Sequence, residues 1–447
     1  MLKIQESNGD IHMKKMIQSG VSVNADGHLC FAGADTVALA DKYGTPLYLM
    51  NESRIRENMR LYKNTLARCF GNGSYPLYAS KALSMKEIYR IAADEKIGTD
   101  IVSTGELYTA MSVGFPPEKM FFHGNNKTDE DIAYAIDCGI GFFVVDNREE
   151  LDSVNSFAVQ KGIRQKILLR LTPGIDPHTF EAVNTGRVDS KFGTSIETGQ
   201  AAELVGYAHG LSNVTVSGYH CHIGSQSFDS RAFIDAAEIM LEFIADMKRR
   251  FGIDAEYLNL GGGYGVRYTD SDPVMDIETE ISAVADSVKA FCKKLDICVP
   301  NILMEPGRSI VADAGITLYT AGSVKQIKGY KNYISVDGGM TDNPRFALYG
   351  AKYTVINATH ADAEPDMIAD IVGRCCESGD IIQKNVSIKR PVRGEKIAVL
   401  VTGAYNYSMS VNYNRLPRPA VVMIRPDGSD SVVVRRESFE DLIKNDI

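Results

Sequence analysis

The sequence lacks features that would point to a membrane or a nucleic acid as partner. No stretch of the 447 residues approaches the ~20 consecutive apolar residues that a membrane-spanning helix requires, although 44% of the residues are apolar. Positive charge is not in excess, because the formal net charge is −9. Nucleic-acid-binding surfaces neutralise phosphates with clustered Lys and Arg. We therefore expect no nucleic acid and no membrane as partner, and any anion-binding site must be local.

Paired cysteines and a secretory signal are also lacking. The eight cysteines form no C-x-x-C pair and no zinc spacing, and they are few for this length. Such usage fits reduced thiols in a cytosol. Residues 1–15 carry charges throughout and lack the roughly 7–15-residue apolar run of a secretory signal. We expect a cytoplasmic protein in which residues 1–20 form a mobile extension.

Short apolar, β-prone runs alternate with longer stretches of helical periodicity from about residue 46. This order predicts parallel strands joined by helical crossovers. Eight runs lie between about residues 75 and 305 once the earlier run PLYLM is set aside, and eight strands close a (β/α)8 barrel. We therefore expect an α/β protein with a TIM-type barrel, and an open doubly wound sheet is the alternative. The predicted helices include 53–67, 85–93, 149–159, 233–249 and 277–294.

The pattern of the sequence changes after residue 310, from alternating strand and helix signals to strand signals alone. Short β-rich runs with turn residues between them, such as GITLYTAGSVKQI and AVVMIRP, predict a C-terminal all-β domain over residues 311–447. The segment VSVNADGHLCFAG at residues 21–33 has the same character, so residues 21–47 are expected to join the β domain. Residues 48–310 are left for the barrel.

Unusual residues stand where the predicted barrel strands end, and loops at strand ends form the mouth of such a barrel. They are Lys81 in YASK, His220, His222 and Ser225 in HCHIGS, Gly261, Gly262 and Gly263 in LNLGGGYG, and Glu305 and Arg308 in EPGRS. A lone lysine in this place is most often a solvated loop residue, and three glycines can form a plain tight turn. Their occurrence together at four strand ends favours a shared site.

The combination fits pyridoxal phosphate. Backbone N–H groups at consecutive glycines bind phosphate well, and neither G-x-x-x-x-G-K-[ST] nor G-x-G-x-x-G is present to indicate a nucleotide. A lysine amine attaches to the aldehyde, a flat imidazole packs on the ring, and the Glu305 carboxylate pairs with a protonated pyridine nitrogen. His220 and His222 are alternatively a metal pair. Because His123 is the one further histidine at a strand end, we expect no metal.

The sequence resembles the fold-type III pyridoxal-phosphate decarboxylases, and among them the diaminopimelate branch. The matching motifs run in family order from about residue 40 to 425. They are YASKA (78–82), DIVSTGEL (100–107), SKFG (190–193), HCHIGSQ (220–226), NLGGGYG (259–265), EPGRS (305–309), DNPRFALYG (342–350), CCESGD (375–380) and TGAYNYSMSVNYN (402–414). The resemblance implies an alanine racemase-like fold, with an N-terminal barrel and a C-terminal β domain. It also implies a homodimer in which CESGD reaches the partner's active site.

The resemblance implies a role for each matched residue. Lys81 carries the cofactor, and Cys376 returns a proton to the substrate. The other cofactor-binding positions are His222 on the ring, Glu305 at the pyridine nitrogen, Ser225, Gly262, Gly263, Pro306, Gly307 and Arg308 at the phosphate, and Tyr405 over the cofactor. The substrate-binding positions are Arg308, Arg345, Tyr349, Glu377 and Tyr405.

Charge indicates the substrate class. The planar donors of Arg308 and Arg345 suit a carboxylate, and Glu377 accepts from an ammonium group. Together they would recognise the distal amino and carboxylate groups of a substrate. This favours meso-2,6-diaminopimelate, with L-lysine and CO2 as products. The alternatives are a related decarboxylase of another carboxylated amino acid, a non-catalytic pyridoxal-phosphate carrier protein, or a metal-dependent hydrolase. The arginines are alternatively surface residues paired with acids such as Asp342, and Cys376 a buried apolar thiol. Cys375 is interpreted as a packing residue.

Overall fold

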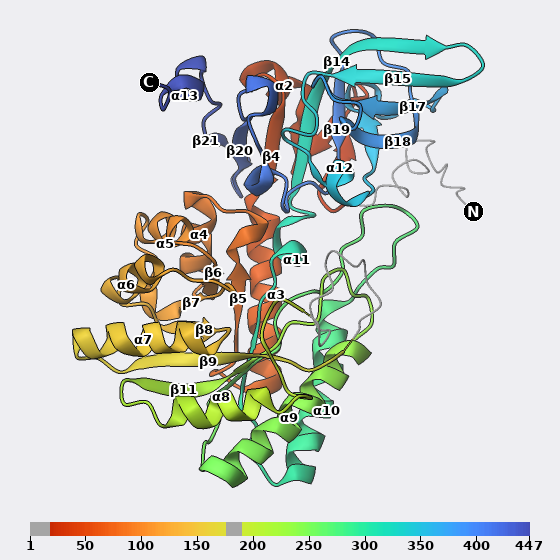
Figure 1. The fold of residues 1–447 in the computed structure, drawn as a ribbon. Helices are drawn as coiled ribbons and strands as arrows, with labels where there is room; N and C mark the ends of the chain where they lie inside the picture. Colours follow the sequence, from red (N-terminus) through yellow and green to blue (C-terminus); the bar gives the residue numbers. More distant parts are fainter. Residues whose placement is uncertain (1–17, 176–189) are drawn as a thin grey trace, which may run out of the picture. The chain divides into compact units, whose positions relative to one another are not determined.

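The computed structural model describes residues 18–175 and 190–447, and it divides into two compact units. The barrel unit comprises residues 56–265 and 275–309, and the β unit comprises residues up to 55, 266–274 and 310–447 (Figure 1). Most of the expected N-terminal extension, residues 1–17, lies outside the described residues. Gln18, by contrast, is buried, and its Nε2 donates to the carbonyl of Asp313 at 2.7 Å. The chain is therefore anchored at Gln18, two residues before the expected end of the extension, whereas Ser19 and Gly20 are exposed.

Eight of the described strands are parallel and close into a barrel. Each pairs with its neighbour in chain order, the last pairs with the first, and the fourth pairs with the fifth, so no gap is left. The strands are β5 (Tyr75–Ala79), β6 (Gly98–Ile101), β7 (Met120–Phe122), β8 (Phe142–Val145), β9 (Gln165–Thr172), β11 (Val214–His220), β12 (Tyr257–Asn259) and β13 (Asn301–Met304). The predicted (β/α)8 barrel is confirmed, and the open sheet is excluded. A short strand, β10 (Thr194–Ser195), extends β9 on one side.

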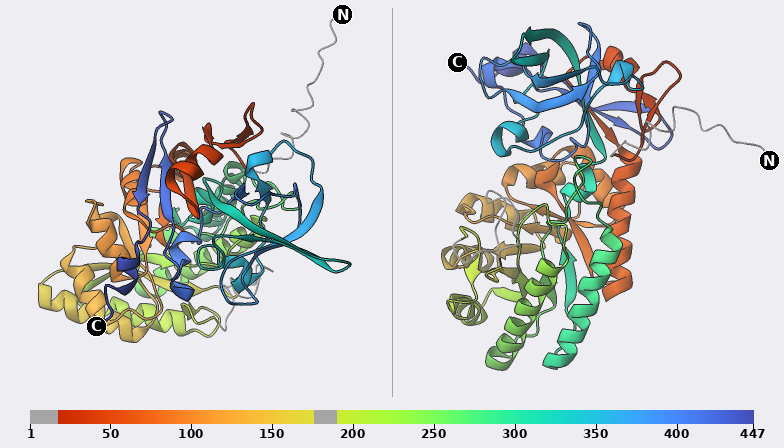
Figure 2. Two further views of the ribbon diagram at one scale, coloured as in Figure 1. Left: turned by 90° about the horizontal axis from the view of Figure 1, so that it is seen from above. Right: turned by 90° about the vertical axis from the view of Figure 1, so that its right-hand side faces the viewer.

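Helices cover the outside of the barrel (Figure 1). They are α3 (Glu52–Phe70), α4 (Lys86–Asp94), α5 (Thr104–Met111), α6 (Asp129–Asp137), α7 (Arg148–Lys161), α8 (Gln200–His209), α9 (Arg231–Phe251) and α10 (Ile277–Leu295). Helices α9 and α10 run side by side (Figure 2). Local signals set the ends: Thr128 and Asp131 form a capping box before α6, and Gly162 ends α7 in the left-handed conformation. Within the described residues, no helix is long and apolar enough to cross a bilayer.

The barrel interior has an apolar layer with a polar layer directly above it. Leu77, Phe121, Val144, Leu168 and Leu303 belong to one buried cluster. Because side chains alternate along a strand, the residue two positions later points to the same interior. In four of these five strands that residue is polar: His123, Asp146, Arg170 and Glu305. Asp100, His220 and Asn259 lie at or next to the ends of β6, β11 and β12, and all seven side chains are at most 9% exposed. The carboxyl end of the barrel therefore holds a ring of buried polar side chains.

In the described part of the β unit, nine strands form one sheet. Its main path is β18-β17-β15-β14-β4-β20-β21, and β19 pairs with β14 and β16. The bounds are β4 (Leu47–Asn51), β14 (Gly315–Ile327), β15 (Lys331–Val336), β16 (Val355–Asn357), β17 (Met367–Val372), β18 (Ile381–Ile388), β19 (Lys396–Val399), β20 (Ala420–Ile424) and β21 (Asp430–Val434). Short helices α11 (Arg308–Val311), α12 (Arg345–Tyr349) and α13 (Phe439–Ile443) also follow residue 307.

Two features near the N-terminus bear on the expected domain bounds. Strand β4 pairs with β14 and β20, so the expected barrel start at residue 48 assigns most of a β-unit strand to the barrel. The segment at residues 21–33 does form strands, β1 (Val21–Val23) and β2 (Leu29–Phe31), with β3 (Ala34–Asp35) added. These three strands form a small sheet of their own, followed by α2 (Thr36–Tyr43). Hydrophobic runs indicate strands but do not say which sheet receives them.

A buried ion pair joins the segment after β7 to helix α7. Lys127 Nζ lies 2.7 Å from Glu150 Oε1 and donates to the carbonyls of Gly124 and Val144, both at 2.9 Å. The side chains of Lys127 and Glu150 are 1% and 2% exposed. We expect Lys127→Met to lower the free energy of unfolding by about 3 kcal/mol or more, since it leaves a buried carboxylate without its cation. Equilibrium urea unfolding measures this change.

The surface pair of Lys161 and Asp137 is a matched control, because both side chains are about half exposed. Lys161→Met is expected to change the same free energy by less than about 1 kcal/mol. Equal losses for the two variants would contradict the role given to the Lys127 pair.

Candidate active site

Lys81 lies at the mouth of the barrel. Strand β5 ends at Ala79, and the chain continues as a single 3-10 turn, η1 (Ser80–Ala82), in which Lys81 is exposed. The backbone N–H of Ser80 donates to Asp100 Oδ1 at 3.0 Å, and Leu83 N–H donates to the Ser80 carbonyl at 3.2 Å. These bonds fix the turn, so the amine of Lys81 extends from a rigid base.

Two acidic side chains lie in the electrostatic surroundings of Lys81. Burial, followed by the charge of Glu305, raises the pKa of Asp100 well above its ordinary value, and the charge of Lys81 acts in the opposite direction. Burial also raises the pKa of Glu106, whose carboxylate accepts from Val102 N–H at 2.8 Å. Both carboxyl groups therefore bind a proton more readily than an exposed carboxyl group does.

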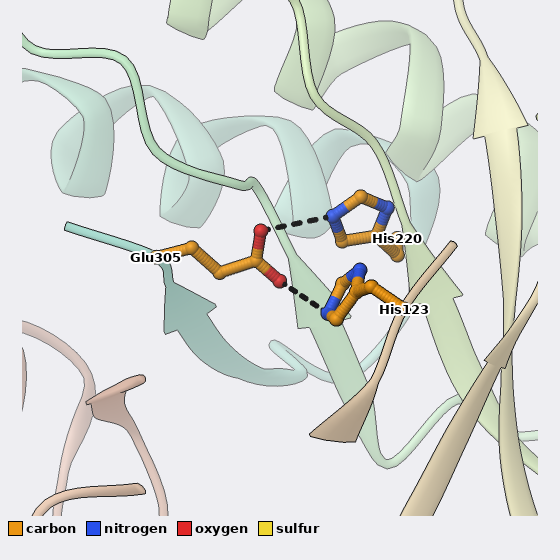
Figure 3. A group of neighbouring side chains, drawn as sticks. All are labelled: His123, His220 and Glu305. Carbon is orange, nitrogen blue, oxygen red and sulfur yellow. Dashed lines mark hydrogen bonds and ion pairs between the residues drawn. The ribbon is translucent and has the colours of Figure 1, made fainter. Parts of the chain in front are cut away.

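Glu305 follows β13, and three side chains at the ends of β7, β11 and β12 surround its carboxylate. Asn259 Nδ2 donates to Oε1 at 2.7 Å, and His220 Nε2 lies 3.3 Å from Oε2. His123 Nε2 lies 2.9 Å from Oε1, at an angle outside that of a directed hydrogen bond (Figure 3). The two imidazole rings meet edge to face, with centroids 4.9 Å apart. Glu305 is thus oriented from both of its oxygens.

The proton balance in this cluster leaves a negative charge on Glu305. Burial by itself would raise the pKa of Glu305, but the electrostatic influence of His123 and His220, together with the hydrogen bond from His220, outweighs burial and holds that pKa well below its usual range. Burial lowers the pKa of His220 to about 4 and also lowers that of His123, so both imidazoles are neutral donors at neutral pH. An ionised carboxylate in this enclosed position favours a cationic partner, such as a protonated pyridine nitrogen.

His123, His220 and Glu305 are also types of residue that ligate metals, and their ligand atoms lie within 4.8 Å of one another. The spacing is that of direct contact. A tetrahedral zinc site with bonds of about 2.0 Å separates its ligand atoms by about 3.3 Å. The 2.9 Å between His123 Nε2 and Glu305 Oε1 is shorter than this and matches a hydrogen-bonding distance. The geometry therefore favours direct contact among these side chains over a metal centre.

The three glycines after β12 are required by close backbone packing. A Cβ on Gly262 would lie 2.1 Å from the Glu305 carbonyl oxygen, and one on Gly263 would lie 2.2 Å from the Gly224 carbonyl oxygen. Gly261 and Gly263 have φ angles of 70° and 125°, which favour glycine. The N–H of Gly261 donates to Asn259 Oδ1 at 2.9 Å, so Gly261 does not offer its N–H to a phosphate. Gly262 and Gly263 are the candidates for that contact.

A guanidinium and a hydroxyl meet close to the same backbone. Arg308, which begins α11 and is 7% exposed, donates from Nη2 and Nε to Ser225 Oγ at 3.0 and 3.3 Å. The Ser225 loop is joined to the glycine turn, because Ser227 N–H donates to the Gly263 carbonyl at 2.9 Å and Gly265 N–H donates back at 2.7 Å. Cation, hydroxyl and glycine backbone together suit a phosphate group.

His222 is the last of the candidate cofactor-binding residues on the barrel unit. Desolvation by the surrounding protein, followed by the positive charges of Lys81 and Arg170, lowers the pKa of His222 well below its ordinary value. A neutral, flat imidazole in the field of Lys81 suits packing on an aromatic ring. The residues present therefore fit pyridoxal phosphate: amine, ring platform, ionised carboxylate and phosphate cradle.

Comparison with known proteins agrees with this fit. Residues 52–312 match the family described as pyridoxal-dependent decarboxylase, pyridoxal binding domain. The diaminopimelate decarboxylase of Bacillus methanolicus is 44% identical over 415 residues, which cover 93% of this chain and 96% of the relative. That of Bacillus subtilis is 41% identical over 424 residues, or 95% and 96% of the two chains. The chain belongs to the diaminopimelate decarboxylase family. Its cofactor is pyridoxal phosphate.

A solved structure of this family has the same fold over nearly the whole chain. Diaminopimelate decarboxylase from M. jannaschii in co-complex with L-lysine is 33% identical, with a TM-score of 0.87, and the match covers 97% of this chain and 98% of the other. The predicted fold class, the enzyme class and the family resemblance are thus confirmed.

The β unit carries the remaining family-motif residues, and it brings some of them together. Arg345 is 8% exposed, and its Nη1 donates to the hydroxyls of Tyr353 and Tyr268 at 2.9 and 3.3 Å. Its Cζ lies 5.7 Å from the ring centre of Tyr405. Tyr349 follows Arg345 by one helical turn in α12 and is 43% exposed. Arg345 is therefore held by tyrosines, and not by Asp342 as one alternative supposed.

Cys376 and Glu377 lie on the loop between β17 and β18, and both are exposed. The backbone N–H of Cys376 donates to Asn414 Oδ1 at 2.9 Å, which anchors the loop. Exposure excludes the buried apolar thiol as an interpretation of Cys376. Cys375 differs: burial and the neighbouring Asp380 raise its pKa to about 12, so its thiol stays protonated.

Sequence reasoning missed several members of the site. Asp100, Asn259 and the pairing of His123 with Glu305 were not predicted, and His220 was weighed as a metal ligand. On the β unit, Tyr268 and Tyr353 were also missed. A polar residue two positions after an inward apolar residue would have indicated His123 and Asn259, which follow Phe121 and Tyr257, because both members of each pair face the interior.

Proposed function

We propose that this protein decarboxylates meso-2,6-diaminopimelate to L-lysine and CO2 with pyridoxal phosphate bound at Lys81. The observation that carries the proposal is the ionised, fully oriented Glu305 carboxylate, which lies with the glycine turn and Lys81 at one end of the barrel. Family membership over nearly the whole chain supports the same reaction. Lysine biosynthesis is the process that such a reaction serves.

Each barrel residue has a distinct task in this proposal. When bound, the cofactor supplies an electron sink that stabilises the electron pair left on Cα as CO2 departs. Glu305 keeps a proton on the ring nitrogen, which deepens the sink. Lys81 provides the amine to which the aldehyde attaches, and His222 supports one face of the ring. Ser225, Gly262, Gly263 and the backbone of Pro306 and Gly307 hold the phosphate together with Arg308.

The β-unit residues have the chemistry to select the substrate and to return a proton. Arg345 offers a rigid planar donor for a carboxylate, because two tyrosine hydroxyls fix its guanidinium. Glu377 is an acceptor for a distal ammonium group, and Tyr349 and Tyr405 flank the arginine. Once the Cα–CO2⁻ bond breaks, the Cys376 thiol gives its proton to Cα, and L-lysine results.

We further propose a homodimer with shared active sites. Cys376 and Glu377 are exposed on a loop, and the segment nearby exposes Leu348, Tyr349, Val411 and Tyr413 as well. Exposed apolar side chains of this size favour a protein interface. In the dimer, the loop of one protomer would complete the site at Lys81 of its partner.

The substrate assignment has a direct test. Purified protein incubated with meso-diaminopimelate is expected to release CO2 and L-lysine in equal amounts, whereas ornithine, which has no distal carboxylate, is turned over at least about 100-fold more slowly per unit concentration. Mass spectrometry of the products and CO2 capture measure both. If a different carboxylated amino acid is turned over in preference, the assignment of meso-diaminopimelate as the substrate is wrong. Cofactor binding without any turnover would indicate a carrier protein.

A further inference from the structure

Asn259, the last residue of β12, links two parts of the cofactor site. Its side chain is completely buried and has a different partner at each end. Asn259 Oδ1 accepts from Gly261 N–H at 2.9 Å, and Nδ2 donates to Glu305 Oε1 at 2.7 Å. One amide therefore joins the glycine turn to the carboxylate that faces the ring nitrogen.

The hydrogen-bond chemistry fixes which way this amide points. The N–H of Gly261 is a donor, so the amide oxygen must face it, and the NH2 group must then face Glu305. An NH2 group donates, so its presence favours the ionised form of Glu305. The backbone supports the same arrangement, because Glu305 N–H donates to the Gly261 carbonyl at 2.8 Å. The side-chain bond from Asn259 additionally orients the carboxylate itself.

We propose that Asn259 is a positioning residue that sets the Glu305 carboxylate and the glycine turn at a fixed separation. The ring nitrogen and the phosphate of pyridoxal phosphate are two separate points of contact at a fixed spacing, so a rigid link between their partners prepares both contacts before binding. Ordering these groups in advance lowers the entropic cost of binding. The inference rests on the proposed cofactor site and concerns the affinity of that site, not the choice of substrate.

The chain offers a closely matched control in Asn357 of the β unit. Asn357 Oδ1 accepts from the N–H two residues later, that of Thr359, at 3.1 Å, and Nδ2 donates to Glu395 Oε2 at 3.0 Å and to the Lys389 carbonyl at 3.4 Å. Asn357 is 1% exposed. The same substitution at the two asparagines therefore removes the same pair of contacts, and at Asn259 alone these contacts belong to the cofactor site.

The test compares cofactor affinity in Asn259→Leu and Asn357→Leu. Apoprotein is titrated with pyridoxal phosphate by absorbance and with inorganic phosphate by calorimetry. We expect Asn259→Leu to raise the Kd for pyridoxal phosphate roughly 10-fold or more, as loss of a hydrogen bond to a charged group does. The Kd for inorganic phosphate should rise too, because the glycine turn loses its hydrogen bond to the Asn259 side chain. Asn357→Leu should change neither, and Glu305→Gln should weaken pyridoxal phosphate alone.

Asn259→Ser separates the two contacts and keeps the test decisive if the leucine variant does not fold. A serine hydroxyl can accept from the N–H two residues later but is too short to reach Glu305. We expect it to retain the affinity for inorganic phosphate and to weaken pyridoxal phosphate. Wild-type affinity in the Asn259 variants, or an equal loss in Asn357→Leu, would overturn the inference. This test measures binding and not turnover. If the protein binds the cofactor tightly but fails to decarboxylate diaminopimelate in the separate substrate test, that result counts against the proposed function and not against this inference.

Discussion

Lys81→Ala is expected to lower turnover by about 10³-fold or more. The substitution removes the amine that attaches to the cofactor, so the cofactor is held by non-covalent contacts alone and loses its fixed orientation over the barrel mouth. The phosphate cradle and Glu305 are left intact. Absorbance and steady-state kinetics measure the two consequences: the protein still binds pyridoxal phosphate, but borohydride no longer fixes it to the chain.

Lys86→Ala is the matched control for this prediction. Lys86 begins α4, five residues after Lys81, and is also exposed. We expect wild-type turnover and wild-type labelling at Lys81 in this variant. Labelling of another lysine in the Lys81→Ala protein, with turnover preserved, would contradict the role assigned to Lys81.

The fold could be predicted well where local signals are strong. The predicted helix at 277–294 corresponds to α10, which begins after an Asp276 cap and ends at Asp296 in the left-handed conformation. The run PLYLM was harder to assign, because its four buried apolar residues, 47–50, suit a barrel strand and a β-unit strand equally. Its sheet is decided by pairing with β14 and β20, hundreds of residues away in the chain. Such pairing leaves no trace in local periodicity.

The candidate site was predictable to a similar degree and for a similar reason. Lys81 and Glu305 stand out because they interrupt apolar runs at strand ends and belong to recognisable motifs. Asn259 is also in a motif, but its neighbours in LNLGGG gave no sign that its amide bridges to Glu305. The partners of Arg345, Tyr268 and Tyr353, come from separate segments that meet through folding. Contacts of this kind depend on tertiary geometry.

Cys376→Ala is expected to slow turnover by about 10²-fold or more while the cofactor stays attached to Lys81. The thiol is proposed as the acid that returns a proton to Cα, and loss of a positioned general acid has an effect of this size. Cys298→Ala is the control, because Cys298 is another exposed free cysteine. Product formed in deuterated water measures the same step: slow or stereochemically mixed deuteration at Cα is expected from Cys376→Ala. Unchanged turnover would rule out Cys376 as the acid.

Mixing the two inactive variants tests whether the active sites are shared. In a mixed dimer of Lys81→Ala and Cys376→Ala protomers, one site would combine an intact Lys81 with the intact Cys376 loop of the partner. Random reassociation should therefore restore about a quarter of wild-type activity, because half of the dimers are mixed and each has one complete site. If Cys376 instead serves the site of its own protomer, both sites of every mixed dimer lack one group. Activity would then remain at the level of the separate variants, and the shared-site homodimer would be excluded.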